Sequence, residues 1–142
     1  MTTLAQNFAA LLIVRNKLSA FIKEEAMKVA LAGENEITVD LSNFDNVDYV
    51  KHYLVDVLGF KLIYANEKFM IIELNEEFAQ VRDFRLKLET EITNLAADAI
   101  DLGKNHVEFD VEDNNAIKVA NTLLTQWGFK VASHEHHVKV EW

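Results

Sequence analysis

The chain contains one stretch of sequence twice. One copy begins GENEITVDL and ends LGFKLIYANEKFMIIEL, and the other begins GKNHVEFDV and ends WGFKVASHEHHVKVEW. A shift of 70 residues places Gly33 on Gly103 and Asp40 on Asp110. After Asp40 the alignment slips by one residue, so that the motif Gly-Phe-Lys matches at a shift of 69. A fold built on this chain therefore has to accommodate two similar halves.

The long apolar stripe before each copy is duplicated as well. The shift of 70 residues also matches Phe8 with Phe78 and Leu18 with Leu88. In both stretches apolar residues recur every three or four positions, which predicts amphipathic helices. The duplication thus divides the chain into repeat units at residues 1–72 and 73–142, and we expect the two units to share one core, since a 70-residue unit alone is marginal.

Each unit is predicted to run helix, strand, helix, strand, strand. Alternating side chains predict the strands, and glycines mark the ends of the helices. The expected elements are helices 4–32, 47–58, 76–102 and 115–127 and strands 36–41, 60–64, 69–74, 106–111, 129–132 and 138–142. The predicted fold class is α+β, with two long helices, mixed three-stranded sheets and pseudo-twofold symmetry. Such a chain looks like a fused homodimer, and we expect it to form homo-oligomers.

Composition excludes several functions. The chain has no cysteine, which removes disulfides, thiol catalysis and sulfur-ligated zinc. The apolar run Phe8–Val14 has no basic residues before it and is too short to cross a bilayer, so we expect a cytoplasmic protein without a membrane contact. The net charge is −9, which makes direct binding to nucleic acid unfavourable.

The negative charge is concentrated in the second repeat. Residues 1–72 have seven basic and nine acidic side chains, whereas residues 73–142 have seven and fourteen. Glu108, Asp110, Glu112 and Asp113 form a row of carboxylates along a predicted strand. This row could bind a basic protein surface, imitate the phosphates of nucleic acid, or only keep the strand solvated. We take these four residues as the candidate partner-binding site.

Two arginines occupy matching positions in the middle of the long helical stripes. Arg15 and Arg85 could hold an anion or form an interface. Alternatively, their aliphatic stems pack on the stripe while their guanidinium groups reach water or nearby carboxylates.

The segment His134-Glu135-His136-His137 is the only one with metal-binding chemistry. In an extended strand His134 and His136 would share a face, so their imidazoles could bind zinc or nickel. The first repeat has an ordinary polar turn there. We therefore predict no dedicated metal site and no cofactor, and leave open whether His134, His136 and His137 bind a physiological metal.

Known catalytic motifs are missing from the sequence. There is no glycine-rich phosphate loop, no GxSxG and no HExxH, and the chain has only four glycines. Ser133 and His134 are neighbours in a predicted strand and point to opposite faces, which makes a poor nucleophile and base. We predict no catalytic residues.

The second repeat resembles small α/β proteins of tailed bacteriophages. The likeness is carried by Gly128, Phe129, Lys130 and Val131, and by a hairpin that closes on Trp142. It covers the strand–helix–hairpin part of each repeat, although Leu74 replaces the final tryptophan in the first. The resemblance implies a phage accessory protein that acts in the host cytoplasm by binding host proteins, and it transfers no functional residues.

These observations favour a non-enzymatic protein-interaction module that binds a protein partner through its acidic surface, which would suit a basic partner. One alternative is a small anionic-ligand binder or enzyme whose site lies at the pseudo-twofold or at a subunit interface, addressed by Arg15 and Arg85. A further alternative is a structural component of an assembly.

Overall fold

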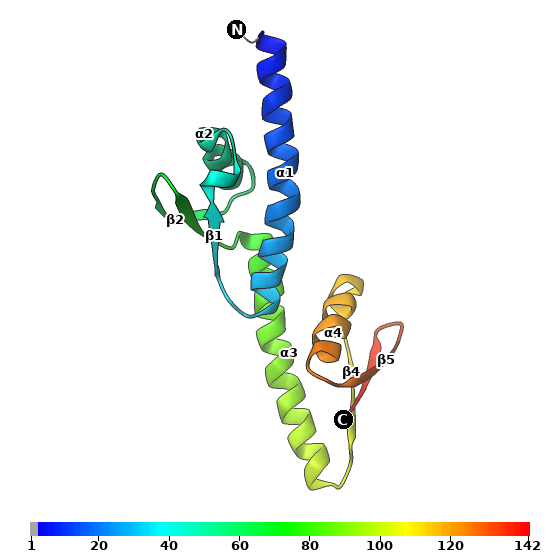
Figure 1. Cartoon of the computed structure of the whole chain (residues 1–142). Coiled ribbons are helices and arrows are strands. Elements are labelled where there is room, and N and C mark those ends of the chain that lie inside the picture. The colour runs from blue at the N-terminus through cyan, green and yellow to red at the C-terminus, as the bar shows by residue number, and fades with distance from the viewer. Residues whose placement is uncertain (1–2) are drawn as a thin grey trace. The chain divides into compact units, whose positions relative to one another are not determined.

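The computed structural model describes residues 3–142, which form two units of the same design (Figure 1). The first unit ends at Arg82 and the second begins at Asp83. The elements of the first unit are α1 (Leu4–Leu31), β1 (Glu36–Asp40), the 3₁₀ helix η1 (Leu41–Asn43), α2 (Val47–Lys51), the π-helix η2 (His52–Val57), β2 (Lys61–Ala65) and β3 (Phe69–Glu73). After α3 (Glu76–Asp101), the second unit contains β4 (His106–Asp110), α4 (Asn114–Gln126), β5 (Lys130–His134) and β6 (His137–Glu141). The predicted α+β class and the repeated element order are confirmed.

The boundary between the two units lies inside α3, later in the chain than the repeat boundary at residue 72. The first turns of α3 belong to the first unit because their side chains pack there. The Phe78 ring stacks on Phe60 with centroids 6.3 Å apart. Asn75 accepts a hydrogen bond from the Phe78 amide and donates one to the Leu58 carbonyl at 2.9 Å. The second repeat therefore contributes the start of its long helix to the first unit.

Each unit has one three-stranded sheet, and both sheets are antiparallel. The strand orders are β1-β3-β2 and β4-β6-β5. The expectation of mixed sheets was wrong, because the last strand of each repeat lies in the centre and runs antiparallel to both of its neighbours. The first and second strands of a unit are parallel to each other, but they are not adjacent.

The long and short helices of a unit cover one face of its sheet. In the first unit, Ile37 and Val39 of β1 are buried between exposed neighbours, and Leu18 and Ile22 of α1 pack in the same core. The second unit repeats the arrangement with Val107 and Phe109 in β4. Each unit is thus a two-layer α/β structure whose other sheet face is open to solvent.

The one-residue slip in the repeat has a structural cause. In the first unit, the Leu58 amide bonds to the Tyr53 carbonyl five residues earlier, within the π-helix. In the second unit the corresponding bond, from Trp127 to Leu123, spans four residues. A π-turn holds one more residue than an α-turn, so the first repeat accommodates its extra residue there.

The edge strands β2 and β5 differ in how regularly they pair with the central strand of their sheet. β2 pairs with β3 up to Leu62 and resumes at Tyr64, so Ile63 forms a bulge. β5 pairs with β6 without a break from Lys130 to His134. The bulge gives the first sheet an irregular edge.

Candidate functional site

Two residues of the predicted row of carboxylates lie on the outer face of the second sheet. Glu108 and Asp110 are exposed in β4, while Val107 and Phe109 between them are buried. The register of β4 and β6 places Lys139 opposite Glu108. The alternation predicted from the sequence is confirmed, and cations of β6 face the row.

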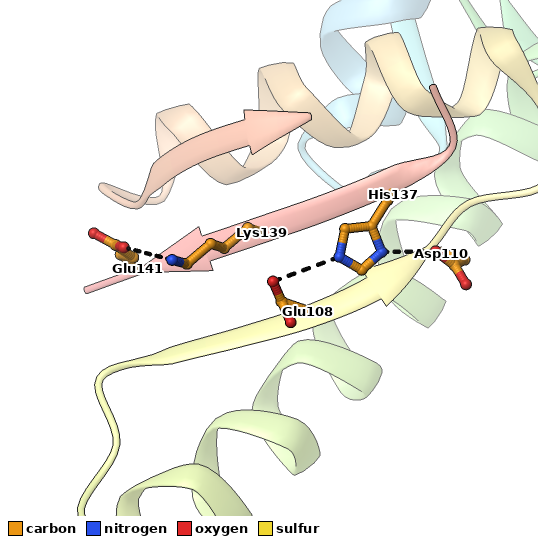
Figure 2. A network of polar contacts seen from close by, with 5 residues as sticks. All are labelled: Glu108, Asp110, His137, Lys139 and Glu141. Atoms are coloured by element: carbon orange, nitrogen blue, oxygen red, sulfur yellow. Dashed lines mark hydrogen bonds and ion pairs between the residues drawn. The ribbon is translucent and has the colours of Figure 1, made fainter. Parts of the chain in front are cut away.

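His137 bridges two of these carboxylates (Figure 2). Its Nδ1 lies 2.9 Å from Oδ1 of Asp110, and its Nε2 lies 3.5 Å from Oε1 of Glu108. The hydrogen bond to Asp110, followed by that to Glu108, raises the pKa of His137 above its usual value. The imidazole therefore places a positive charge within the acidic row as the pH falls.

The other two predicted residues lie beyond the end of β4. Asp113 caps α4 by accepting a hydrogen bond from the Asn115 amide at 2.8 Å. Glu112 is exposed just before it. Together with Asp110, they form part of the lining of a groove between α3 and the segment that joins β4 to α4.

This groove is a feature of the second unit that could receive another molecule. It has a volume of about 1030 Å³. Its apolar lining comprises Phe84, Leu86, Leu88, Phe109, Val111 and Ala116. Its charged lining comprises Glu91, Asp110, Glu112, Asp113 and the single cation Lys87. The row of carboxylates predicted from the sequence therefore includes three of the four acidic residues that line the groove. Glu91 was missed because it belongs to α3.

In the first unit two aromatic rings occupy positions whose counterparts in the second unit lie in the groove lining or next to it in sequence, and a smaller pocket of about 410 Å³ lies beside them, lined by Val14, Asp45 and Asn46 among others. Phe21 of α1 and Phe44 pack edge to face, with centroids 6.2 Å apart. The shift of 70 residues places Glu91 and Asn114 at these positions. Moreover, α4 begins at Asn114, so the segment that presents Phe44 in the first unit is wound into a helical turn in the second. These phenylalanine-to-polar replacements are the sequence signal that would have located the groove.

A lysine of the long helix, four residues before Phe21 in the first unit and before Glu91 in the second, has different surroundings in the two units. In the first unit, Lys17 donates to the Asn43 carbonyl at 2.8 Å and lies over the Phe44 ring at 5.4 Å from its centroid. Its counterpart Lys87 lines the groove instead. The two repeats thus use the same cation differently.

The two predicted anion-binding arginines are engaged within their own units. The Arg15 guanidinium lies over the Tyr53 ring at 5.6 Å. That of Arg85 lies over Trp127 at 5.7 Å and pairs with Glu89 at 3.0 Å. Neither arginine lines the groove. The Arg85–Glu89 pair is of the kind that the structural alternative predicted, whereas the contacts with the Tyr53 and Trp127 rings were not predicted.

The histidine segment is a tight turn and not a continuous strand. β5 ends at His134 and β6 begins at His137, so Glu135 and His136 make a two-residue connection in which Glu135 has a φ of 55°. An extended strand through both His134 and His136, the condition under which they would share a face, is therefore not present. His136 contacts the Val111 carbonyl through Nδ1 at 2.9 Å. Within residues 3–142, no three His, Asp or Glu side chains are grouped so that they could hold a metal ion.

Comparisons with known proteins give no family assignment. No protein-family model matches the chain, and no significant match was found among curated proteins or solved structures. None of the helices in residues 3–142 is both long and apolar enough to span a bilayer. The geometry of the groove is therefore the basis for a functional proposal.

Proposed function

We propose that this protein is a non-enzymatic interaction module whose second unit binds a basic segment of another protein in the acidic groove. The observation that carries the proposal is the combination of six apolar residues with four acidic residues and one lysine in the lining of a single groove. Carboxylates around an apolar surface complement a peptide that presents Lys or Arg around an apolar anchor.

The first unit indicates which kind of side chain from a partner would fit the groove. Phe21 and Phe44 fill the corresponding place there, with Phe44 only 9% exposed. An aromatic side chain from a partner would restore in the second unit the packing that the first unit achieves by itself. Aromatic anchors in desolvated pockets contribute strongly to protein–protein affinity.

The alternative functions have less support. An anionic ligand would meet four carboxylates in the groove, and the guanidinium groups of Arg15 and Arg85 are occupied with aromatic rings. If the chain is a phage accessory protein, as its resemblance implies, the basic partner is a host protein.

A peptide series tests the proposal. A fluorescent peptide with a central phenylalanine flanked by lysines is titrated with the full chain, and binding is followed by anisotropy. We expect binding that weakens as salt increases, because exposed charges are screened. Replacing the phenylalanine with alanine, or the lysines with glutamate, should abolish it.

Matched variants locate the site. Ala116→Phe fills the groove and keeps every carboxylate, so we expect at least about a tenfold loss of affinity, or about 1.4 kcal/mol. Ala97→Phe makes the same change at an exposed position of α3 outside the groove and should bind normally. Glu91→Gln keeps the shape and should weaken binding chiefly at low salt. Equal binding by the phenylalanine and alanine peptides, or unchanged binding by Ala116→Phe, would refute the groove as the site.

A further inference from the structure

The beginning of α1 exposes a large apolar surface. Leu4, Phe8 and Leu12 are 68%, 60% and 59% exposed. At 100° per residue, Leu4 and Phe8 lie on the same side of the helix as the buried Leu18 and Ile22, and Leu12 lies at the margin of that side. No charged side chain occurs between Leu4 and Val14. The stripe that packs α1 onto its own sheet therefore continues beyond that sheet without a cover.

The repeat identifies a surface that fits this stripe. The counterpart of Phe8 is Phe78 at the start of α3, and Phe78 is only 8% exposed. It stacks on Phe60 with an interplanar angle of 19°, next to the buried Leu74. The end of the first unit's sheet thus covers the stripe that the second repeat presents.

The second unit has the same sheet end, and that end is open. The Trp142 amide donates to the Asn105 carbonyl at 3.1 Å, as the Leu74 amide donates to the Asn35 carbonyl at 3.0 Å. In place of the fully covered Phe60 there is Phe129, which is only half-buried. Trp142 touches its edge and remains 42% exposed.

We propose that Phe8 and its neighbours on α1 dock on the Phe129–Trp142 end of the second unit of another copy of this chain. The contact would repeat the packing of Phe78 on Phe60 between two molecules. An uncharged helical segment can approach the acidic second unit without electrostatic repulsion. Because the donor and acceptor surfaces differ, the contact is heterologous and leads to a ring or an open chain of copies.

The first test compares two charge insertions in the full chain. Sedimentation and light scattering should show species that grow with concentration from the 16.2 kDa chain. Phe8→Glu should reduce the mass to that of one chain. Ile13→Glu inserts the same charge at a residue that is 69% exposed and lies on another side of α1, and it should assemble like the natural chain. Circular dichroism verifies that both variants fold.

The second test distinguishes head-to-tail docking from other contacts. Trp142→Glu damages the acceptor and retains the backbone hydrogen bond to Asn105. Alone, Phe8→Glu and Trp142→Glu should each be monomeric. Mixed, they should form a heterodimer and nothing larger, because one supplies an intact acceptor and the other an intact donor.

Three results would overturn the proposal. A natural chain that stays monomeric up to millimolar concentration has no such interface. Assembly of Trp142→Glu alone would indicate pairing of α1 with α1. A mixture that remains monomeric would show that the two surfaces do not bind each other.

Discussion

Phe21 and Phe44 pack edge to face in the first unit, with an interplanar angle of 66°. They join α1 to the segment that follows β1. In the second unit, Glu91 and Asn114 stand at the two positions, and the rings are replaced by the groove. The first unit thus has a packed aromatic pair at the place where the second unit has a groove.

The aromatic pair should matter for stability only in the first unit. Phe44→Ala removes a ring that is 9% exposed, and truncation of a buried phenylalanine costs about 3–5 kcal/mol. The counterpart Asn114→Ala changes an exposed residue and should alter stability by less than about 0.5 kcal/mol. Urea unfolding followed by circular dichroism measures both, and equal effects would contradict the difference in packing.

His137 should titrate above an unperturbed histidine. Its pKa is raised by Asp110 and then by Glu108, so Asp110→Asn should lower that pKa more than Glu108→Gln. Because the folded-state pKa exceeds the unfolded value near 6.5, the stabilisation is complete below that value and disappears as the pH rises through the folded pKa. An NMR titration of the imidazole Cε1–H measures the pKa. A value unchanged in Asp110→Asn would be inconsistent with the observed contacts.

The acidic groove should respond to the same titration. Protonated His137 partly neutralises Asp110, which lines the groove. Binding of the lysine peptide is therefore expected to weaken as the pH falls through the pKa of His137. His137→Gln should remove this dependence, and anisotropy titrations at a series of pH values provide the comparison.

The π-helix should tolerate the loss of one residue. Deleting Val57, which is 58% exposed, would let the turn between Leu54 and Phe60 adopt the α-helical spacing of the second unit. We expect a folded chain with stability within about 1–2 kcal/mol of the original, an estimate based on the modest cost of a regular helical turn. Deleting Gln126 from α4 shortens a turn that already has α-helical spacing, and it should destabilise the second unit. Thermal melting of both deletions is the measurement, with equal damage as the contrary result.

Gly128 should resist replacement for conformational reasons. Its φ is 91°, and a Cβ placed there would meet no atom within 4 Å. Gly128→Ala should therefore cost about 1–2 kcal/mol from backbone strain alone. Gly128→Asn should cost less, since asparagine tolerates positive φ. Tryptophan fluorescence follows the unfolding, because Trp127 precedes this residue and Trp142 contacts the ring of Phe129, which follows it. Equal costs would point to a steric cause instead.

Much of the fold could be predicted because local patterns and global packing agree. The apolar stripes located α1 and α3, and the alternation around Ile37 and Val107 located β1 and β4. The duplication then indicated that both halves share one design. These features depend on periodicity, which a single sequence displays directly.

The remaining features depend on contacts between distant residues. Strand order is decided by the central position of β3 and β6, which periodicity does not encode. The acidic row was found, but Glu91 reaches the groove from α3 and has no sequence neighbour in the row. The turn between β5 and β6 was predicted, but not that it is only two residues long, with a positive φ at Glu135.

The bulge at Ile63 limits how copies of this protein can aggregate. An exposed outer strand offers unpaired backbone groups to any other strand, and an interrupted register makes continuous pairing difficult. Leu62, Ile63 and Tyr64 are each at least 43% exposed, so a regular edge at this place would be both apolar and open. The irregularity in β2 therefore hinders continuous strand pairing at an edge that is both exposed and apolar.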